Sequence, residues 1–292
     1  MKRPDNLFTK IFLDSGSADD TKTIIESIGF LDGQTTNPTY FVKKNPNITQ
    51  AVENGKRFSE NELLSAYKNL AQEISDYLSG TGSVSIEVYA DKNTTAADMI
   101  KQGKKMWQWI PNAHIKLPII PAGLEAARVL IDQGMRVNMT LCFSQQQAAA
   151  VHAATRGAKK GDVYISPFVS RLDKIGSNGF DLLKNIQQMY SVQDSHVEIL
   201  AASVHSVYDI AHIIENNIDR ITIPFDDFKT WIEKGMPKNT QNLEKKDESN
   251  LRPIEYLELD LTKDVETFNI QHELTNKGLE TFATDWNAVL SD

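Results

Sequence analysis

Along the first 235 residues, eight short segments rich in β-branched and apolar residues alternate with stretches of helical periodicity. The segments are KIFLDSG (10–16), GQTTNP (33–38), SVSIEVYA (83–90), AHIKLP (113–118), RVNMTL (136–141), DVYISPFV (162–169), HVEILAAS (196–203) and RITIPF (220–225). Strands separated by helices pair in parallel through right-handed crossovers, and a closed barrel needs eight such units. The alternation therefore predicts an α/β fold of the (β/α)8 TIM-barrel type.

An open, doubly wound sheet is the alternative architecture for the same alternation. No G-x-G-x-x-G or Walker-type phosphate loop follows any of these segments, which disfavours that alternative. Two intervening helices carry capping boxes, Ser59 with Glu62 and Ser144 with Gln147. We expect these helices to end at the glycines of positions 80 and 157.

Residues 1–235 are predicted to form the barrel, and residues 236–292 an extension within the same domain. The stretch MPKNTQNLEKKDESN (236–250) is polar and is typical of a linker or mobile loop. From residue 260 helical character resumes, with Phe282, Trp286 and Leu290 at four-residue spacing. We expect this C-terminal helical extension to pack back on the barrel.

Charge and cysteine content exclude several classes of protein. The net charge is −8, and residues 235–292 hold 12 acidic against 6 basic side chains, which argues against nucleic acid or an anionic membrane as a partner. The single cysteine, Cys142, allows no internal disulfide and no cysteine-based zinc site, and it is expected to be a small core residue. No H-E-x-x-H or similar spacing predicts a metal site, and the absence of a leader or membrane-length apolar run predicts a cytoplasmic protein.

Two charged residues lie inside apolar strand segments, Lys116 in HIKLPII and Glu87 in SIEV. A charged group in such a place costs several kcal/mol unless it is paired or neutralised. Burial disfavours an ammonium ion, so Lys116 could supply a neutral amine that attacks a ketone and forms a Schiff base. A structural Lys116–Glu87 ion pair is the alternative, and these two residues alone do not decide between the two roles.

Polar residues follow nearly every predicted strand. In a barrel of this kind such residues converge on a mouth at the C-terminal strand ends, where active sites form. Each one also has an ordinary structural interpretation, as a helix cap, an Asx-turn or a satisfied strand hydroxyl. The candidates are Asp14, Asn37, Glu87, Lys116, Asn138, Thr140, Ser166, Arg171 and Ser203.

The ordered run of FLDSG, GQTTNPT, SIEV, IKLPIIPAGLEA, NMTLCFSQQQA, YISPFVSRLDKIG and ILAAS resembles the transaldolase family over most of residues 11–225. The closing HELTNKGLETFATDWNAVL is also similar to the C-terminal helix of many members. The resemblance implies a pentose-phosphate-pathway enzyme that needs no cofactor. Such an enzyme moves a dihydroxyacetone unit from a ketose phosphate, of the sedoheptulose 7-phosphate or fructose 6-phosphate type, to an aldose phosphate through a lysine Schiff base.

The resemblance also implies roles for individual residues. Lys116 matches the Schiff-base lysine, Asp14 a proton-transfer residue, and Glu87 with Thr140 the pair that holds a catalytic water. Relatives that act as free aldolases carry glutamine where Glu87 stands and tyrosine where Phe168 stands, so both positions resemble the transferases. The residues expected to bind the substrate are Thr36, Asn37, Asn138, Ser166, Phe168, Arg171, Ser203 and His205, with Arg171 and Ser203 at the phosphate.

Two positions depart from the family pattern. His205 stands where members place a basic residue two positions after the serine of AAS, and Ile120 replaces a threonine four residues after the lysine. The first departure leaves open a weaker phosphate preference or a sulfonated sugar. The same residues also suit a lysine-dependent aldolase that releases free dihydroxyacetone, or a non-catalytic sugar-phosphate-binding barrel. The number of chains that assemble, including a homo-oligomer, is left open.

Overall fold

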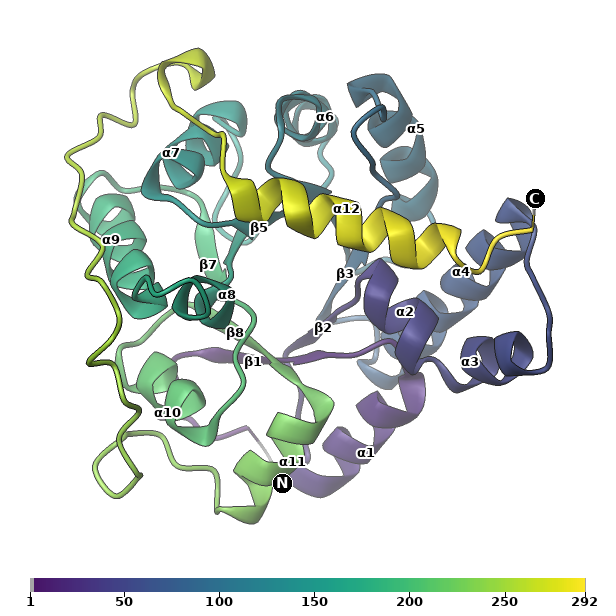
Figure 1. Cartoon of the computed structure of the whole chain (residues 1–292), viewed down its shortest axis with the longest axis horizontal. Coiled ribbons are helices and arrows are strands. Elements are labelled where there is room, and N and C mark those ends of the chain that lie inside the picture. The colour runs from purple at the N-terminus through teal and green to yellow at the C-terminus, as the bar shows by residue number, and fades with distance from the viewer. Residues whose placement is uncertain (1–2, 292) are drawn as a thin grey trace.

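The computed structural model of the protein describes residues 3–291. All strand pairs are parallel, and β8 pairs with β1, so the ring closes as an eight-stranded barrel (Figure 1). This confirms the predicted (β/α)8 barrel and excludes the open sheet. The strands are β1 Lys10–Asp14, β2 Gly33–Thr35, β3 Ser83–Glu87, β4 Ala113–Pro118, β5 Val137–Cys142, β6 Val163–Pro167, β7 Glu198–Ala201 and β8 Arg220–Pro224.

Helices surround the barrel, and two additional short helices lie between β2 and α4. The helices are α1 Ala18–Ile28, α2 Pro38–Lys44, α3 Pro46–Glu53, α4 Glu60–Tyr77, α5 Ala96–Trp107, α6 Pro121–Asp132, α7 Gln145–Ala154, α8 Val169–Asp173, α9 Gly179–Val192, α10 Val207–Glu215, α11 Phe225–Glu233, the 3-10 turn η1 Val265–Thr267 and α12 Glu273–Asn287. None of the helices among residues 3–291 has both the length and the apolar character needed to cross a bilayer.

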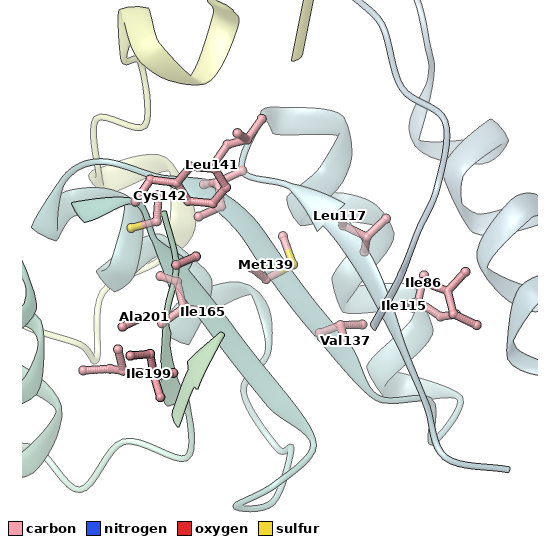
Figure 2. Packing of buried hydrophobic residues seen from close by; sticks show 14 of the residues in the cluster. Ile86, Ile115, Leu117, Val137, Met139, Leu141, Cys142, Ile165, Ile199 and Ala201 are labelled. Atoms are coloured by element: carbon pink, nitrogen blue, oxygen red, sulfur yellow. The ribbon is translucent and has the colours of Figure 1, made fainter. Parts of the chain in front are cut away.

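The main core lies between the strands and the helices that cover them. Ile115 and Leu117 of β4 and Val137 and Met139 of β5 are fully buried members of this core (Figure 2). Because successive side chains of a strand point to opposite faces, the residues between them point into the barrel. This alternation places Lys116 on the interior face of β4.

The predicted capping boxes are present, but both helices end earlier than expected. Ser59 and Glu62 cap α4, and Ser144 and Gln147 cap α7, with the side-chain and backbone hydrogen bonds of both boxes formed. The helices end at Tyr77 and Ala154 rather than at the glycines of positions 80 and 157. Those two glycines have φ angles of 66° and 93° and lie in the turns that follow the helices.

The prediction that helical character resumes at residue 260 is wrong, because α12 begins only at Glu273 after one 3-10 turn. Glutamine side chains of the barrel helices hold the preceding segment extended. Gln145 donates to the carbonyl of Leu257 at 2.6 Å and accepts from its N–H at 2.9 Å. Gln193 donates to the carbonyl of Leu259 and accepts from the N–H of Leu261, so these amides replace helical hydrogen bonds.

Helix α12 crosses over the barrel and packs on α2 and β5 (Figure 1). Near its start, the hydroxyl of Thr275 donates to the carbonyl of Leu141 at 2.9 Å. Near its end, Asp285 accepts from Thr39 Oγ1 at 2.6 Å and pairs with Lys43 Nζ at 2.7 Å. The helix is therefore attached to the barrel at both ends, with its centre over the mouth.

Candidate active site

A cavity of about 220 Å³ opens at the C-terminal ends of the strands. Nine of the residues singled out from the sequence line it: Asp14, Asn37, Lys116, Thr140, Ser166, Phe168, Arg171, Ser203 and His205. The cavity is also lined by Thr35, Thr39, Tyr40, Lys174, Ala202, Thr222, Pro224, Thr281 and Phe282. The strand-end residues therefore converge on one chamber, as expected for this fold.

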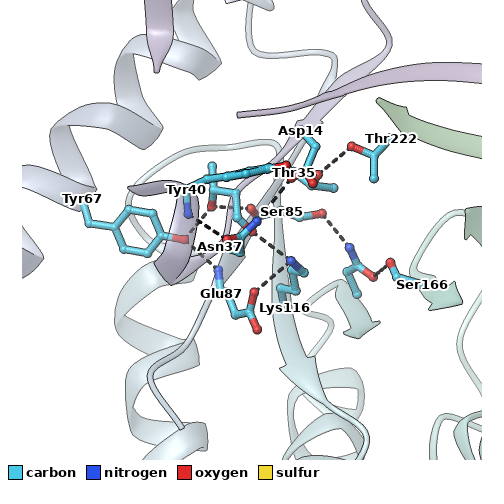
Figure 3. Close-up of polar contacts among 12 residues, drawn as sticks. Asp14, Thr35, Asn37, Tyr40, Tyr67, Ser85, Glu87, Lys116, Ser166 and Thr222 are labelled. Carbon is cyan, nitrogen blue, oxygen red and sulfur yellow. Dashed lines mark hydrogen bonds and ion pairs between the residues drawn. The ribbon is translucent and has the colours of Figure 1, made fainter. Parts of the chain in front are cut away.

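Lys116 and Glu87 form a buried ion pair beneath this cavity. Parallel pairing of β3 with β4 places the two residues side by side, and Lys116 Nζ lies 2.8 Å from Glu87 Oε2 (Figure 3). The two side chains are only 5% and 4% exposed. The amine also donates to the carbonyl of Thr36 at 3.0 Å. The ion pair considered from the sequence is thus present, and its lysine faces the cavity.

The Glu87 carboxyl does not line the main cavity and is reached through Lys116. Burial raises the pKa of Glu87 above its usual value, and the charge of Lys116 opposes that shift. The backbone N–H of Glu87 donates to the hydroxyl of Tyr67 at 3.0 Å. The raised pKa makes the Glu87 carboxylate a stronger proton acceptor than an exposed glutamate.

Asp14 lies at the end of β1, separated from the strand of Glu87 by β2. Burial raises the pKa of Asp14, while the charge of Lys116 and a hydrogen bond from Thr35 lower it. Thr35 Oγ1 lies 2.8 Å from Asp14 Oδ1, and Asn37 Nδ2 lies 3.5 Å from the same oxygen. The site thus holds two carboxyls whose pKa values are both raised, a property typical of groups that accept and return protons.

Asn37 serves both as a helix cap and as part of the cavity wall. Its Oδ1 accepts the N–H of Tyr40 at 2.9 Å and so caps α2, which begins at Pro38. The neighbouring Thr36 does not line the cavity, because its hydroxyl bonds to the Tyr67 hydroxyl and the Ser85 carbonyl. Thr36 contributes its backbone carbonyl to Lys116 instead.

Asn138 is fully buried just below the cavity and does not line it. Its Oδ1 accepts from Ser166 Oγ at 2.8 Å, and its Nδ2 donates to Ser85 Oγ at 3.1 Å (Figure 3). Thr140 lies two residues further along β5 and faces the cavity. Its buried hydroxyl has no hydrogen-bond partner within residues 3–291, so it is free to bind a ligand or a water.

The rim of the cavity carries positive charge. The Arg171 guanidinium lies 4.9 Å from the ring centre of Phe168 and 5.8 Å from that of Phe282, and burial lowers its pKa. No carboxylate in the described part of the chain forms an ion pair with Arg171. His205 is more exposed, at 45% of its side chain, and contacts Asp227 at 3.3 Å. Arg171 is therefore better placed than His205 for an anionic ligand, and Lys174 adds a further positive charge to the cavity lining.

Several residues of the site were not found from the sequence. Thr35 of β2 and Thr222 of β8, the strands on either side of β1, hydrogen-bond to each other at 2.6 Å. Tyr67 reaches the site from helix α4. Phe282 comes from α12, far along the chain. The spacing of Phe282 predicts only an apolar helix face, a pattern that does not show which core residue also touches the site. No group of three or more potential metal-ligating side chains occurs in the region the structure describes.

Comparison with known proteins agrees with this geometry. The model of the transaldolase/fructose-6-phosphate aldolase family matches residues 11–292. A probable transaldolase of Cereibacter sphaeroides is 33% identical and covers 95% of each chain. One from Lactiplantibacillus plantarum is 32% identical over 96% of this chain and 97% of its own. A solved tryptophan synthase alpha-subunit from Pyrococcus furiosus aligns with 80% of this chain and 93% of its own, at a TM-score of 0.48 and 13% identity, too distant to bear on function. From its sequence, the chain belongs to the transaldolase/fructose-6-phosphate aldolase family.

Proposed function

We propose that this transaldolase-type enzyme transfers a dihydroxyacetone unit from a ketose phosphate to an aldose phosphate through a Schiff base on Lys116. The observation that carries the proposal is the position of the Lys116 amine. It is buried in the wall of the strand-end cavity and lies 2.8 Å from a carboxyl that can take its proton. The substrates are small sugar phosphates, and the residues of the chain supply all the chemistry.

The first half of the reaction forms the covalent intermediate. Glu87 takes a proton from Lys116, and the neutral amine attacks the carbonyl carbon of the ketose. One of the two protons left on the nitrogen moves to the former carbonyl oxygen, which becomes a hydroxyl. The resulting carbinolamine must lose its hydroxyl as water, which requires a proton at that oxygen. Glu87 returns the proton through a water held by Thr140, whose hydroxyl is free, and the iminium ion forms.

The second half breaks and remakes a carbon–carbon bond. Asp14 accepts the proton of the hydroxyl next to the scissile bond. The bond then breaks, the aldose leaves, and the bonding electrons pass into the iminium to give an enamine. The enamine carbon attacks the aldehyde of the acceptor, and Asp14 returns its proton to the new alkoxide. Water then hydrolyses the iminium and releases the product from Lys116.

The hydroxyls of the donor face Asn37 and Ser166 on the cavity wall. Beneath the cavity, Asn138 accepts a hydrogen bond of 2.8 Å from the Ser166 hydroxyl, which fixes the orientation of that serine. Glu87 and the apolar ring of Phe168 favour a transferase over an aldolase that releases dihydroxyacetone, since both positions match the transferases.

Borohydride trapping tests the proposal directly. Incubation with a ketose phosphate followed by reduction is expected to add one three-carbon adduct to the peptide that contains Lys116, since the secondary amine formed is stable to mass analysis. Turnover should require an acceptor aldehyde. A sugar-binding barrel without activity would give no adduct, and an aldolase would turn over equally well without acceptor.

The proposed phosphate site predicts a substrate-dependent effect of Arg171→Ala. Loss of the charge-assisted, bidentate contact is expected to raise KM for a phosphorylated donor by about 10²-fold. KM for the same sugar without phosphate should change little. Arg171→Lys keeps the charge without the planar fork, so its KM for the phosphorylated donor should lie between the values for the unmodified enzyme and for Arg171→Ala.

Steady-state kinetics with matched phosphorylated, sulfonated and unmodified sugars would measure these effects and show which anion the rim prefers. An equal loss with charged and uncharged donors would contradict an anion-binding role for Arg171.

A further inference from the structure

Helix α12 brings one aromatic ring to the centre of the active site. Phe282 is 6% exposed, lines the strand-end cavity, and has its ring centre 5.9 Å from Lys116 Nζ. The same ring lies 5.8 Å from the Arg171 guanidinium. No acid–base or binding role in the proposed reaction uses this side chain.

Phe282 also borders a second, much smaller cavity of about 10 Å³. Its wall includes Glu87, Leu279 and Phe282, whereas the main cavity is lined by Lys116 and Phe282. A space of this size holds about one water molecule. Of the residues that line these two cavities, Phe282 alone borders both, which puts it at the boundary between the main cavity and a water-sized space against Glu87.

A third cavity, of about 230 Å³, lies further out under α12 and is lined by Leu279 but not by Phe282. Leu279 and Phe282 are three residues apart and therefore occupy the same side of the helix. Leu279 therefore borders the space under α12, and Phe282 borders the main cavity that holds the catalytic amine. Of the two side chains, only Phe282 touches the main cavity.

The ring is held rigidly in this position. Besides the attachments at Thr275 and Asp285, the α-carbon of Gly278 packs so closely on Leu141 that an added Cβ would lie 2.6 Å from Leu141 Cδ2. Trp286, one helical turn after Phe282, packs against Phe41 with ring centres 5.8 Å apart. These contacts hold helix α12, and with it Phe282, against the barrel.

We propose that Phe282 determines the fate of the enamine, by keeping water away from the intermediate so that only an aldehyde discharges it. The proposal rests on the Schiff-base function. The enamine carbon has two outcomes. Attack on an aldehyde forms a new carbon–carbon bond. Protonation from water gives the iminium of dihydroxyacetone, which a second water hydrolyses to free dihydroxyacetone and the Lys116 amine.

The test compares Phe282→Ala and Phe282→Leu with Leu279→Ala, a control on the same helix that borders the small cavity and the space under α12 but not the main cavity. The measured quantity is the ratio of free dihydroxyacetone to transfer product, with a saturating acceptor aldehyde. Phe282→Ala is expected to raise this ratio about tenfold and Phe282→Leu about threefold, since each admits water in proportion to the volume lost. Leu279→Ala should leave the ratio within about twofold of the unmodified enzyme.

Equal losses of release and transfer in both Phe282 variants, with an unchanged ratio, would overturn the proposal and assign the ring a packing role. If Phe282→Ala does not fold, an unchanged ratio in Phe282→Leu overturns it just as well. Borohydride trapping of the unmodified enzyme separates this outcome from failure of the underlying mechanism. A missing Lys116 adduct refutes the Schiff base, whereas a normal adduct with an unchanged ratio refutes only the role of Phe282.

Discussion

Lys116→Met is expected to lower turnover by on the order of 10⁴-fold or more, because the amine that pairs with Glu87 is removed and the covalent route is lost. The borohydride adduct should disappear at the same time. The measurement is transfer of the three-carbon unit under saturating donor and acceptor, together with the mass of the peptide that contains position 116.

Lys116→Arg is the matched control for charge. Arginine retains a cation near Glu87 and a donor near the Thr36 carbonyl, which replaces the contacts at 2.8 and 3.0 Å, but its guanidinium does not lose a proton and forms no Schiff base. We expect this variant to be inactive while staying closer to the parent in thermal stability than Lys116→Met, in which Glu87 is buried without a partner. Full activity of Lys116→Arg would contradict the mechanism.

Asp14→Asn is expected to block carbon–carbon bond cleavage without blocking Schiff-base formation. Asparagine cannot take the proton of the donor hydroxyl, so transfer should fall by about 10²–10⁴-fold. The intermediate should then accumulate before cleavage. Borohydride trapping distinguishes the steps, since the adduct on Lys116 should have the mass of the whole ketose and not of the three-carbon unit. A three-carbon adduct at the normal rate would exclude Asp14 as the base.

The same substitution should stabilise the fold at neutral pH. Burial raises the pKa of Asp14 in the folded state, so folding binds its proton more tightly and wild-type stability falls as pH rises from the unfolded to the folded pKa of this group. Asp14→Asn removes that penalty, and its melting temperature is expected to rise by about 1–4 °C at pH 8. The gain should shrink as the solution is acidified.

Scanning calorimetry across pH measures this difference, with Asp19→Asn as the control on the exposed first turn of α1. A rise in melting temperature that is independent of pH, or equal in Asp19→Asn, would show that the ionised Asp14 does not destabilise the fold. Because protonated Asp14 cannot act as the base, activity should fall on acidification. The raised pKa predicts that this fall begins at a higher pH than the usual aspartate pKa of 3.8 would give.

The fold could be predicted from the sequence because each strand is a short apolar run bounded by turn residues, and the order of strands in the barrel follows the order in the chain. The pairing of Lys116 with Glu87 was considered for the same reason, since charged residues in such runs require partners. The sequence does not show how residues beside the cavity, rather than in its wall, support the site, because their contacts depend on neighbouring strands. Thr36, expected to bind the substrate, contributes its carbonyl to Lys116 instead, and Asn138 accepts a hydrogen bond from Ser166 beneath the cavity.

The late start of α12 and the place of Phe282 were beyond sequence reasoning for another reason. Both depend on contacts between segments more than 100 residues apart, such as Gln145 with Leu257. Local periodicity indicates that a helix forms and which face is apolar. It does not indicate where on the barrel that face docks, and so it cannot show that one of its rings meets the catalytic amine.

The pairing of β1 with β8 has a kinetic consequence. Glu87 and Lys116 lie on strands that follow each other in the chain and pair directly, whereas Asp14 lies opposite Pro224 in the last strand of the ring. Joining those two ends requires closing a loop of most of the barrel, which is an entropically demanding, slow event. Asp14 also pairs with Thr35 of β2, and β2 pairs with β3, so strands β1 to β4 can bring Asp14, Glu87 and Lys116 together before the ring closes. Closure of the ring is therefore expected to follow the assembly of the three catalytic residues and to limit the rate at which the complete barrel forms.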